Sequence, residues 1–166
     1  ATGSSGSGAK AQSGTHHPER MADFRAYKVL THQHQAEVGQ LLADAGSPDL
    51  HLAFVPASAP LVRGIFATAQ FELPEGVDAA FLKTRFEAFY ADAPFVQVVD
   101  GSPRVAAVAG SNRAELAVHA DGHSAAVLVA LDNLMKGMAG QAIQNLNLAL
   151  GLEERAGLWR PGRWPA

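Results

Sequence analysis

Cysteine is absent from the 166 residues of the chain. This absence excludes a disulfide scaffold, a zinc site built on thiolates and a cysteine nucleophile within the chain. The sequence also lacks an apolar run as long as a membrane helix, a basic stripe of the kind that binds nucleic acid, and the charged and apolar regions of a signal peptide. We therefore expect a cytoplasmic protein with neither membrane nor nucleic-acid partners.

The composition is that of a globular domain. Hydrophobic residues make up 48% of the sequence and charged residues 17%, with a formal net charge of −3. Such a balance is typical of a chain that buries a sizeable core, and the length suits one domain. Because the first residue is Ala1 rather than Met, we expect the chain to be a piece of a longer protein.

The apolar pattern predicts strands and helices in separate runs. Helical spacing predicts a helix around residues 37–42, another over 81–90 and a long one over 133–150. Short apolar or alternating stretches predict strands, with a hairpin turn at Asp121-Gly122; these strands are residues 27–30, 50–56, 62–73, 95–99, 114–120 and 124–131. Since strand and helix do not alternate regularly, we predict an α+β fold with a mixed or antiparallel sheet and helices on one face.

Four segments can be distinguished along the chain. Residues 1–20 form a Gly/Ser-rich loop segment, in which the run from Gly3 to Gly8 is typical of a flexible linker. Residues 21–131 carry the α+β pattern, residues 132–158 the long helix, and residues 159–166 an irregular tail rich in Pro, Arg and Trp.

Two histidines carry the strongest hint of chemistry. His32 and His34 project to the same side of an extended segment, and Glu37 could orient the imidazole of His34 if a helix begins between the two histidines. A histidine held by a carboxylate suits general acid/base work near neutral pH. Two other interpretations stay open: surface histidines beside an acidic residue at a helix start, or a metal site with His16 and His17, for which no carboxylate has suitable spacing.

The start of the long helix is rich in glycine and amide side chains. Backbone N–H groups between Asp132 and Ala142 could approach a phosphate or a carboxamide. Equally, the glycines could permit close packing of the helix on the sheet, with Asp132 or Asn133 as the N-cap. Arg63 either presents its guanidinium to an anion or is a solvated strand end.

Four elements, taken in order, resemble the N-acetyl-gamma-glutamyl-phosphate reductases. Residues 32–38, His-Gln-His-Gln-Ala-Glu-Val, resemble that family's His-Arg-His-Thr-Pro-Glu-Ile element. Residues 62–68, Val-Arg-Gly-Ile-Phe-Ala-Thr, resemble its Arg-Gly-Ile-Leu-Ala-Thr strand, and residues 110–112, Gly-Ser-Asn, resemble its Gly-Ser/Thr-Asn turn. Residues 132–147 resemble its long C-terminal helix.

The resemblance implies an NADP-dependent oxidoreductase of arginine biosynthesis. In that family a Rossmann domain and a nucleophilic cysteine precede an α+β domain like the C-terminal domain of the glyceraldehyde-3-phosphate dehydrogenase-like semialdehyde dehydrogenases. The cysteine attacks the acyl phosphate, phosphate leaves, and hydride from NADPH reduces the thioester to N-acetylglutamate semialdehyde. Residues 21–131 would then be the substrate and dimerisation domain of a homo-oligomer, and residues 132–158 would contact the missing cofactor domain. The chain alone should be inactive.

The resemblance also implies roles for particular residues. His34 would be the acid/base, Glu37 would orient it, His32 would contact the substrate, and Arg63 would hold the substrate phosphate or carboxylate. The serine-rich start resembles the loop that follows the family's cysteine and would be a substrate or phosphate loop, made of Ser4, Ser5, Ser7 and Gly8. The residues facing the cofactor would be Asn133, Lys136, Gly137, Gly140 and Gln141.

The sequence departs from the family pattern at Gln33, Gln35 and Ala36, where the family has Arg, Thr and Pro. Residues 16–20 also resemble the branch whose aminoadipyl or glutamyl phosphate substrate, in lysine or arginine biosynthesis, is attached to a small acidic carrier protein. The mild acidity of the chain offers no docking patch for such a carrier, so the acetylated small molecule is the preferred substrate. A non-enzymatic, detached dimerisation module is the alternative from another class.

Overall fold

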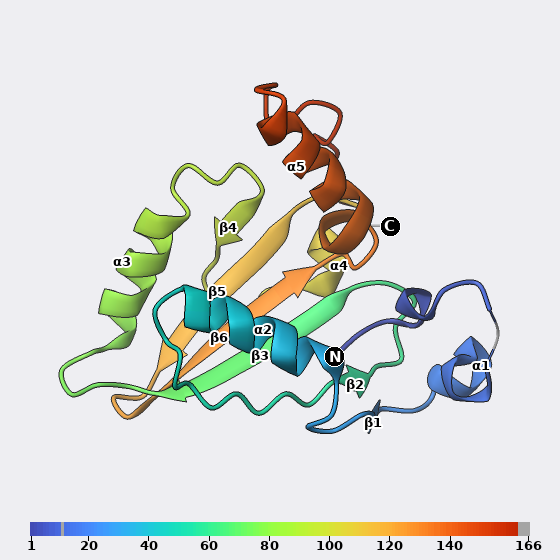
Figure 1. The fold of residues 1–166 in the computed structure, drawn as a ribbon, viewed down its shortest axis with the longest axis horizontal. Helices are drawn as coiled ribbons and strands as arrows, with labels where there is room; N and C mark the ends of the chain where they lie inside the picture. The colour runs from blue at the N-terminus through green and yellow to red at the C-terminus, as the bar shows by residue number, and fades with distance from the viewer. Residues whose placement is uncertain (11, 163–166) are drawn as a thin grey trace. The chain divides into compact units, whose positions relative to one another are not determined.

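The computed structural model describes residues 1–10 and 12–162 (Figure 1). The chain divides into two compact units, which we call the N-terminal unit (Ala1–Leu61) and the C-terminal unit (Val62–Ala166). Among the described residues, no helix combines the length and the apolar character that crossing a membrane requires.

The N-terminal unit has little regular structure. Two short 3-10 helices, η1 (Ser4–Ser7) and η2 (Ser13–Thr15), precede the four-residue helix α1 (His17–Arg20). Strand β1 (Arg25–Ala26) pairs antiparallel with β2 (Ala57–Ser58), and the helix α2 (Gln33–Asp44) lies between them in the sequence. A parallel bridge between Thr2 and Ser58 ties the start of the chain to β2.

Helix α2 begins and ends where local chemistry favours it. The Nδ1 atom of His32 accepts a hydrogen bond from the backbone N–H of His34, so His32 caps the helix. Past the C-terminal end, Gly46 adopts a φ of 100°, a left-handed conformation that glycine reaches without strain. The predicted helix around residues 37–42 is thus confirmed and is longer than predicted.

Two strands predicted in this unit are wrong. Residues 27–30 form a turn, in which Lys28 and Leu30 have positive φ angles of 43° and 56° that a strand does not allow. Residues 50–56 lie outside any strand, and the pairing strand β2 follows them. Short apolar stretches are ambiguous because periodicity needs more residues than these segments contain.

The C-terminal unit is built on a four-stranded sheet of order β3-β6-β5-β4. Strands β3 (Ile65–Glu72), β6 (Ser124–Leu131) and β5 (Ala114–Ala120) are antiparallel neighbours, whereas β4 (Val96–Val98) runs parallel to β5. The sheet is therefore mixed, and the predicted α+β class is confirmed. The strands predicted at residues 62–73, 95–99, 114–120 and 124–131 are all present.

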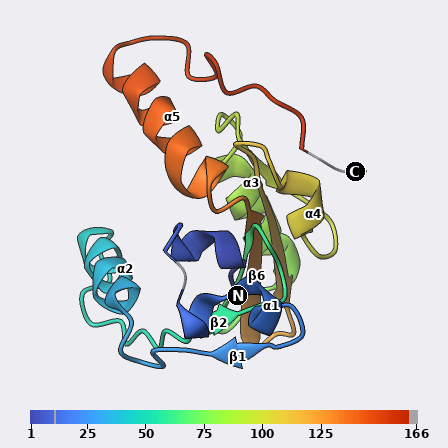
Figure 2. The ribbon, with the colours of Figure 1, turned by 90° about the vertical axis from the view of Figure 1, so that its right-hand side faces the viewer.

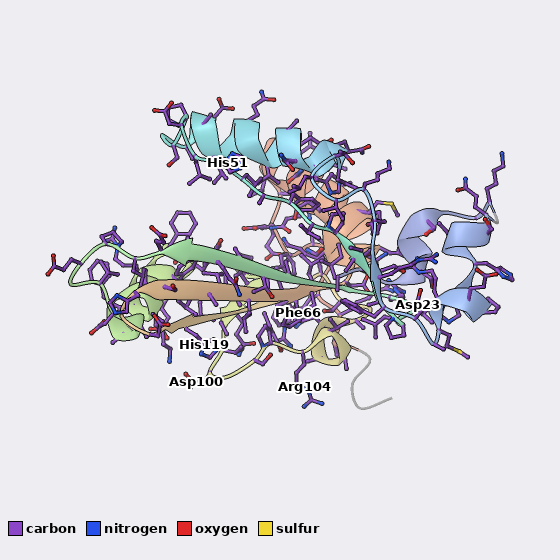
Figure 3. All side chains as sticks on the ribbon, turned by 90° about the horizontal axis from the view of Figure 1, so that it is seen from below. Asp23, His51, Phe66, Asp100, Arg104 and His119 are labelled. Atoms are coloured by element: carbon purple, nitrogen blue, oxygen red, sulfur yellow. The ribbon has the colours of Figure 1, made fainter. Side chains whose placement is uncertain are left out.

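Two helices of this unit lie on one side of the sheet (Figure 3). Helix α3 (Ala79–Phe89) packs on β4 and β5, and the short helix α4 (Val105–Val108) packs on β6. The core lies where β5 and β6 meet, and Leu116, Ala117 and Ala130 are each at most 5% exposed. Edge strand β3, by contrast, is exposed from its third residue onward.

The C-terminal helical segment consists of two parts. A π-helical turn, η3 (Met135–Ala139), is followed by α5 (Gly140–Ala149), which extends beyond the end of β6 (Figures 1 and 2). The helix predicted over residues 133–150 is confirmed except at its ends. Residues 150–158, which we also assigned to the helical segment, form turns and irregular backbone, and Gly151 leaves the helix with a φ of 66°.

Candidate functional site

The histidine motif lies at the first turn of α2. The helix begins at Gln33, between His32 and His34, which is the condition under which Glu37 can reach His34. The Nε2 atom of His34 lies 3.7 Å from Oε2 of Glu37, a distance for an ion pair rather than a hydrogen bond. The two side chains are 53% and 62% exposed. Water therefore screens the pair, and His34 is accessible to a reactant.

Aromatic rings pack around the two histidines. The ring centroids of His32 and His34 are 4.5 Å apart, and Phe54 lies 5.5 and 6.0 Å from them. Tyr27 approaches His32 edge-on at 5.7 Å. Desolvation, and next the neighbouring His34, lower the pKa of His32 from its ordinary value of 6.5. His32 is therefore neutral at pH 7, and because its Nδ1 accepts the helix-capping hydrogen bond, its proton resides on Nε2.

The serine-rich start of the chain forms a pocket. Ser4, Ser5 and Ser7 of η1, together with Lys10 and His17, line a space of about 260 Å³. Among the described residues that line it, none is acidic. The pocket offers hydroxyl and basic groups, which are donors suited to an anion.

Side chains of helix α1 form hydrogen bonds with the serine run that lines this pocket. The Oγ atom of Ser4 lies 2.8 Å from Nδ1 of His17. The guanidinium of Arg20 donates to Oγ of Ser7 at 3.2 Å and to the carbonyl oxygen of Thr2 at 2.9 Å. Only 4% of Arg20 is exposed. The serine run is thus a folded loop held by side-chain hydrogen bonds, rather than the flexible linker that composition alone suggests.

In the C-terminal unit, Arg63 forms an ion pair with a buried carboxylate. Its Nη2 atom donates to Oδ1 of Asp132 at 2.8 Å, and the side chain of Asp132 is fully buried. Burial alone would raise the pKa of Asp132, but the hydrogen bond from Arg63 and three backbone N–H groups outweigh it and lower that pKa. Those N–H groups belong to Gly110, Leu134 and Met135.

The ion pair bears on two predictions. Asp132 accepts from the N–H groups of Leu134 and Met135, but the N-cap residue of η3 is Leu134 rather than the predicted Asp132 or Asn133. The charge of Arg63 already has a partner in this unit, so its role toward a substrate anion stays a prediction.

Asn133 joins the same region to the start of β3. Its Oδ1 atom accepts a hydrogen bond from the backbone N–H of Gly64 at 2.6 Å. Gly64 has a φ of 108°, and a Cβ atom there would overlap the side chain of Val105. Glycine is required at this position because of its positive φ and its contact with Val105 of α4.

The other residues predicted to face a cofactor lie along η3 and α5. Lys136 donates through Nζ to Oε1 of Gln144 at 2.7 Å, and burial lowers the pKa of Lys136 although Glu154 opposes the shift. A Cβ atom at Gly140 would overlap Oδ1 of the buried Asn112. The packing interpretation of that glycine is therefore realised. The cofactor role of the whole set stays a prediction.

Gln141 and Gly137 complete that set. Gln141 donates to Oδ1 of Asn145 at 2.9 Å on the exposed side of α5. Gly137 lies over the end of β6, where an added Cβ would be 3.4 Å from the carbonyl oxygen of Asp132.

Sequence reasoning missed several polar residues that the structure brings together. Arg20 belongs to the motif at residues 16–20, and the polar residues around it in the sequence give no sign that it is buried. Gln144 bridges Asn112 and Lys136 on one side and Glu154 on the other, at 3.0, 2.7 and 2.7 Å. The sequence gives no signal for this burial, because the buried face of α5 carries Gly140, Gln144 and Asn147 rather than apolar side chains.

A shallow groove of about 590 Å³ lies at the opposite end of the sheet from Asp132 and contains none of the predicted site residues; it is lined by Gln70, Phe71, Glu72, His119, Ala120, Asp121, Ser124, Ala125 and Ala126. Within the described parts of the chain, no three His, Asp or Glu side chains are grouped as a metal site would require.

Comparison with known proteins identifies the family to which the chain belongs. Residues 1–133 match the family model described as "Semialdehyde dehydrogenase, dimerisation domain". The chain is 40% identical over 166 residues to a protein of Methanosarcina barkeri named N-acetyl-gamma-glutamyl-phosphate reductase, with 99% of this chain and 49% of the relative covered. Relatives of the same name from Methanopyrus kandleri and Desulforudis audaxviator are each 41% identical and cover 99% of this chain. The chain spans about half the length of these curated relatives.

Solved structures support the fold. The crystal structure of aspartate semialdehyde dehydrogenase II from Vibrio cholerae superposes on this chain with a TM-score of 0.58 at 16% identity. The superposed region covers 72% of this chain and 37% of that protein. The same enzyme in complex with ASA gives a TM-score of 0.56 at 17% identity. At these identities the likeness concerns the fold alone.

Proposed function

Because the chain belongs to the semialdehyde dehydrogenase dimerisation-domain family, we propose that it is the C-terminal part of an NADP-dependent N-acetyl-gamma-glutamyl-phosphate reductase. The whole enzyme would convert N-acetyl-gamma-glutamyl phosphate, NADPH and a proton into N-acetylglutamate semialdehyde, NADP⁺ and phosphate. The observation that carries the proposal is the accessible His34 at the start of α2, in a chain about 40% identical to relatives of that name. Without the rest of the protein, the chain is expected to be inactive.

We assign the proton transfers to His34. A thiol from elsewhere in the protein would displace phosphate from the acyl carbon, and NADPH, when bound, supplies the hydride that reduces the thioester. Reduction places negative charge on the former carbonyl oxygen, and the imidazolium of His34 donates a proton to it. As the carbon–sulfur bond breaks to release the aldehyde, the imidazole takes that proton back.

Neighbouring residues would prepare His34 for this work. Glu37 lies 3.7 Å from Nε2 of His34 and would hold the imidazole in one orientation. His32 is neutral, and its Nε2–H is a donor suited to a substrate oxygen. Phe54 packs against both rings and limits their rotation.

Substrate binding is proposed for the serine-rich pocket and for Arg63. Ser4, Ser5 and Ser7 line a pocket without acidic side chains, which favours an anionic group. Arg63 is held in one orientation by Asp132, as a guanidinium that recognises a carboxylate or phosphate needs to be. The acetylated substrate is preferred over a carrier-linked one because the relatives bear its name.

The start of the helical segment would face NADP in the missing half. Asn133, Lys136, Gly137, Gly140 and Gln141 lie along it, with the amide of Gln141 on the exposed side of α5. The apolar residues Ile143, Leu146 and Leu150 recur at helical spacing and are 42%, 55% and 63% exposed. An apolar stripe of this kind calls for a covering surface, and we assign that role to the cofactor-binding half.

Assembly as a homodimer, or a larger homo-oligomer, is proposed from the dimerisation domain to which the family model corresponds. The exposed side chains of edge strand β3 offer a surface for a second copy. A biosynthetic enzyme that draws on NADPH would work in the cytoplasm.

The deciding experiment is an assay of the complete gene product that contains this chain. NADPH formation would be followed with N-acetylglutamate semialdehyde, phosphate and NADP⁺, and aspartate semialdehyde would serve as the comparison substrate. We expect turnover with the first aldehyde and little with the second, and none from the 166-residue chain alone. Preference for aspartate semialdehyde, or turnover by the isolated chain, would refute the proposal.

A further inference from the structure

We infer that Arg20 is a positioning residue of a phosphate-binding pocket at the start of the chain, and that it acts through the hydroxyl of Ser7. The inference rests on the proposed function in one respect: the phosphate group would be that of the acyl phosphate or the inorganic phosphate released from it. The pocket itself rests on the geometry of the N-terminal unit alone.

Arg20 is a buried cation without a counter-ion. Its exposed fraction is 4%. Among the described residues, Arg25, Arg63 and Lys83 each have a carboxylate within 4.0 Å, but Arg20 has none. Its Nε atom is buried and has no hydrogen-bond partner. A guanidinium removed from water without a compensating negative charge is unfavourable. An anion bound nearby would relieve that cost.

The hydrogen bonds of Arg20 lead to the pocket. Nη2 fixes the backbone of Thr2, just before η1, and Nη1 donates to Oγ of Ser7. Since Ser7 accepts from Arg20, its own hydroxyl hydrogen is free to donate to another acceptor, and Ser7 lines the pocket. Donation from a charged group also polarises that hydroxyl and makes it a better donor.

The rest of the lining fits a phosphate group. Ser4 pairs with Nδ1 of His17 at 2.8 Å, and Lys10 adds an ammonium group to the lining. The space of about 260 Å³ is several times the roughly 30 Å³ that a water molecule occupies in the liquid, so a phosphate group can enter. A tetrahedral oxyanion with several acceptors matches hydroxyl donors spread along one turn of η1 better than a planar carboxylate does.

The test uses inorganic phosphate and the 166-residue chain, because binding requires neither the thiol nor NADP. Affinity would be measured by calorimetric titration and by the phosphate-dependent rise of the unfolding midpoint, at constant ionic strength, with acetate as the comparison anion. We expect saturable phosphate binding that is at least tenfold weaker in Arg20→Gln and in Ser7→Ala. Arg20→Lys, which keeps the charge but not the planar fork, should recover part of the loss.

Arg25→Gln is the matched control. Arg25 belongs to the same unit and carries the same charge, but its side chain is 47% exposed and its hydrogen bond goes to the carbonyl oxygen of Gly14. It should bind phosphate as the parent chain does. If Arg20→Gln does not fold, Ser7→Ala decides, because Ser7 is exposed and tolerates truncation.

Several results would overturn the inference: no phosphate binding by the parent chain, acetate binding as tight as phosphate binding, or equal losses in the Arg20 and Arg25 variants. Phosphate binding by the chain together with an inactive complete gene product would remove the proposed function and leave the pocket. An active enzyme whose chain ignores phosphate would do the reverse.

Discussion

The His34–Glu37 pair of the N-terminal unit and the Arg63–Asp132 pair of the C-terminal unit differ in how far they are exposed. In the N-terminal unit, His34 and Glu37 meet in solvent at 3.7 Å and are 53% and 62% exposed. In the C-terminal unit, Asp132 has no exposed side-chain surface and accepts four hydrogen bonds, one from Arg63 and three from the backbone. An exposed pair contributes little to stability, whereas removing one partner of a buried pair is costly. Substitutions of His34 or Glu37 should therefore affect activity, whereas substitutions of Asp132 should affect folding.

The largest effect is expected for His34→Gln in the complete gene product. Removing the proposed acid/base should lower kcat by roughly 10²- to 10⁴-fold, because proton transfer by a positioned side chain typically contributes that much. The unfolding midpoint should hardly move. His51, an exposed histidine in the loop after α2 (Figure 3), provides the control His51→Gln, which should retain the parental rate. Loss of activity in both variants would contradict a specific role for His34.

Asp132→Ala should be the most destabilising substitution in the C-terminal unit. It leaves the Arg63 guanidinium and three partly buried N–H groups without their acceptor, at a cost of about 3–5 kcal/mol. Chemical denaturation of the chain would measure the loss. Asp92→Asn, an exposed aspartate, should change stability by no more than about 0.5 kcal/mol. An Asp132→Ala chain as stable as its parent would show that the buried Arg63–Asp132 pair does not stabilise the C-terminal unit.

A glycine in α2 and another in α5 sharpen the comparison. Gly140→Ala places a methyl group against Asn112 and 2.8 Å from the carbonyl oxygen of Met135, so it should destabilise by about 1–3 kcal/mol. Gly39→Ala in α2 meets no atom within 4 Å and should stabilise by about 0.5–1 kcal/mol. Denaturation midpoints of the two variants should move in opposite directions. Shifts of the same sign would contradict the packing of Gly140.

The smallest effect concerns the pH dependence of the cap of α2. The folded-state pKa of His32 lies below its unfolded value of 6.5, so the folded state favours the neutral ring. Its contribution is present above pH 6.5 and is lost as the pH falls through the folded-state pKa. His32→Asn keeps a cap that does not titrate, and thermal unfolding at pH 7.5 and 5.5 should show a smaller difference for the variant than for the parent. An equal difference would exclude His32 as the source.

Features fixed by neighbouring residues could be predicted from the sequence. The hairpin at Asp121-Gly122 follows from local chemistry: Oδ1 of Asp121 accepts from the N–H groups of His123 and Ser124, and Gly122 adopts a φ of 94°. The helix start at His32 is equally local. In both places the deciding hydrogen bonds span two or three residues.

Features that depend on distant contacts could not be predicted. Arg63 and Asp132 are 69 residues apart in the sequence, and no periodic pattern pairs them. The burial of Arg20 likewise depends on Thr2 and Ser7, which precede it by 18 and 13 residues. For residues 27–30 the apolar pattern favoured a strand, but the positive φ angles of Lys28 and Leu30 turn the chain instead. The candidate site residues were proposed from motif resemblance, whereas the contacts that support them could not be predicted from the sequence.

Strand β3 has one more consequence. It pairs along its whole length with β6 on one side, and within the described residues it has no strand neighbour on the other. The outward-facing N–H and C=O groups of this eight-residue strand, with exposed side chains such as Phe71 at 42%, can pair with a strand of another molecule. If the chain is produced without a protein surface that covers this edge of the sheet, it should be prone to form fibrils. Production of the fragment should therefore be followed by light scattering as well as by yield.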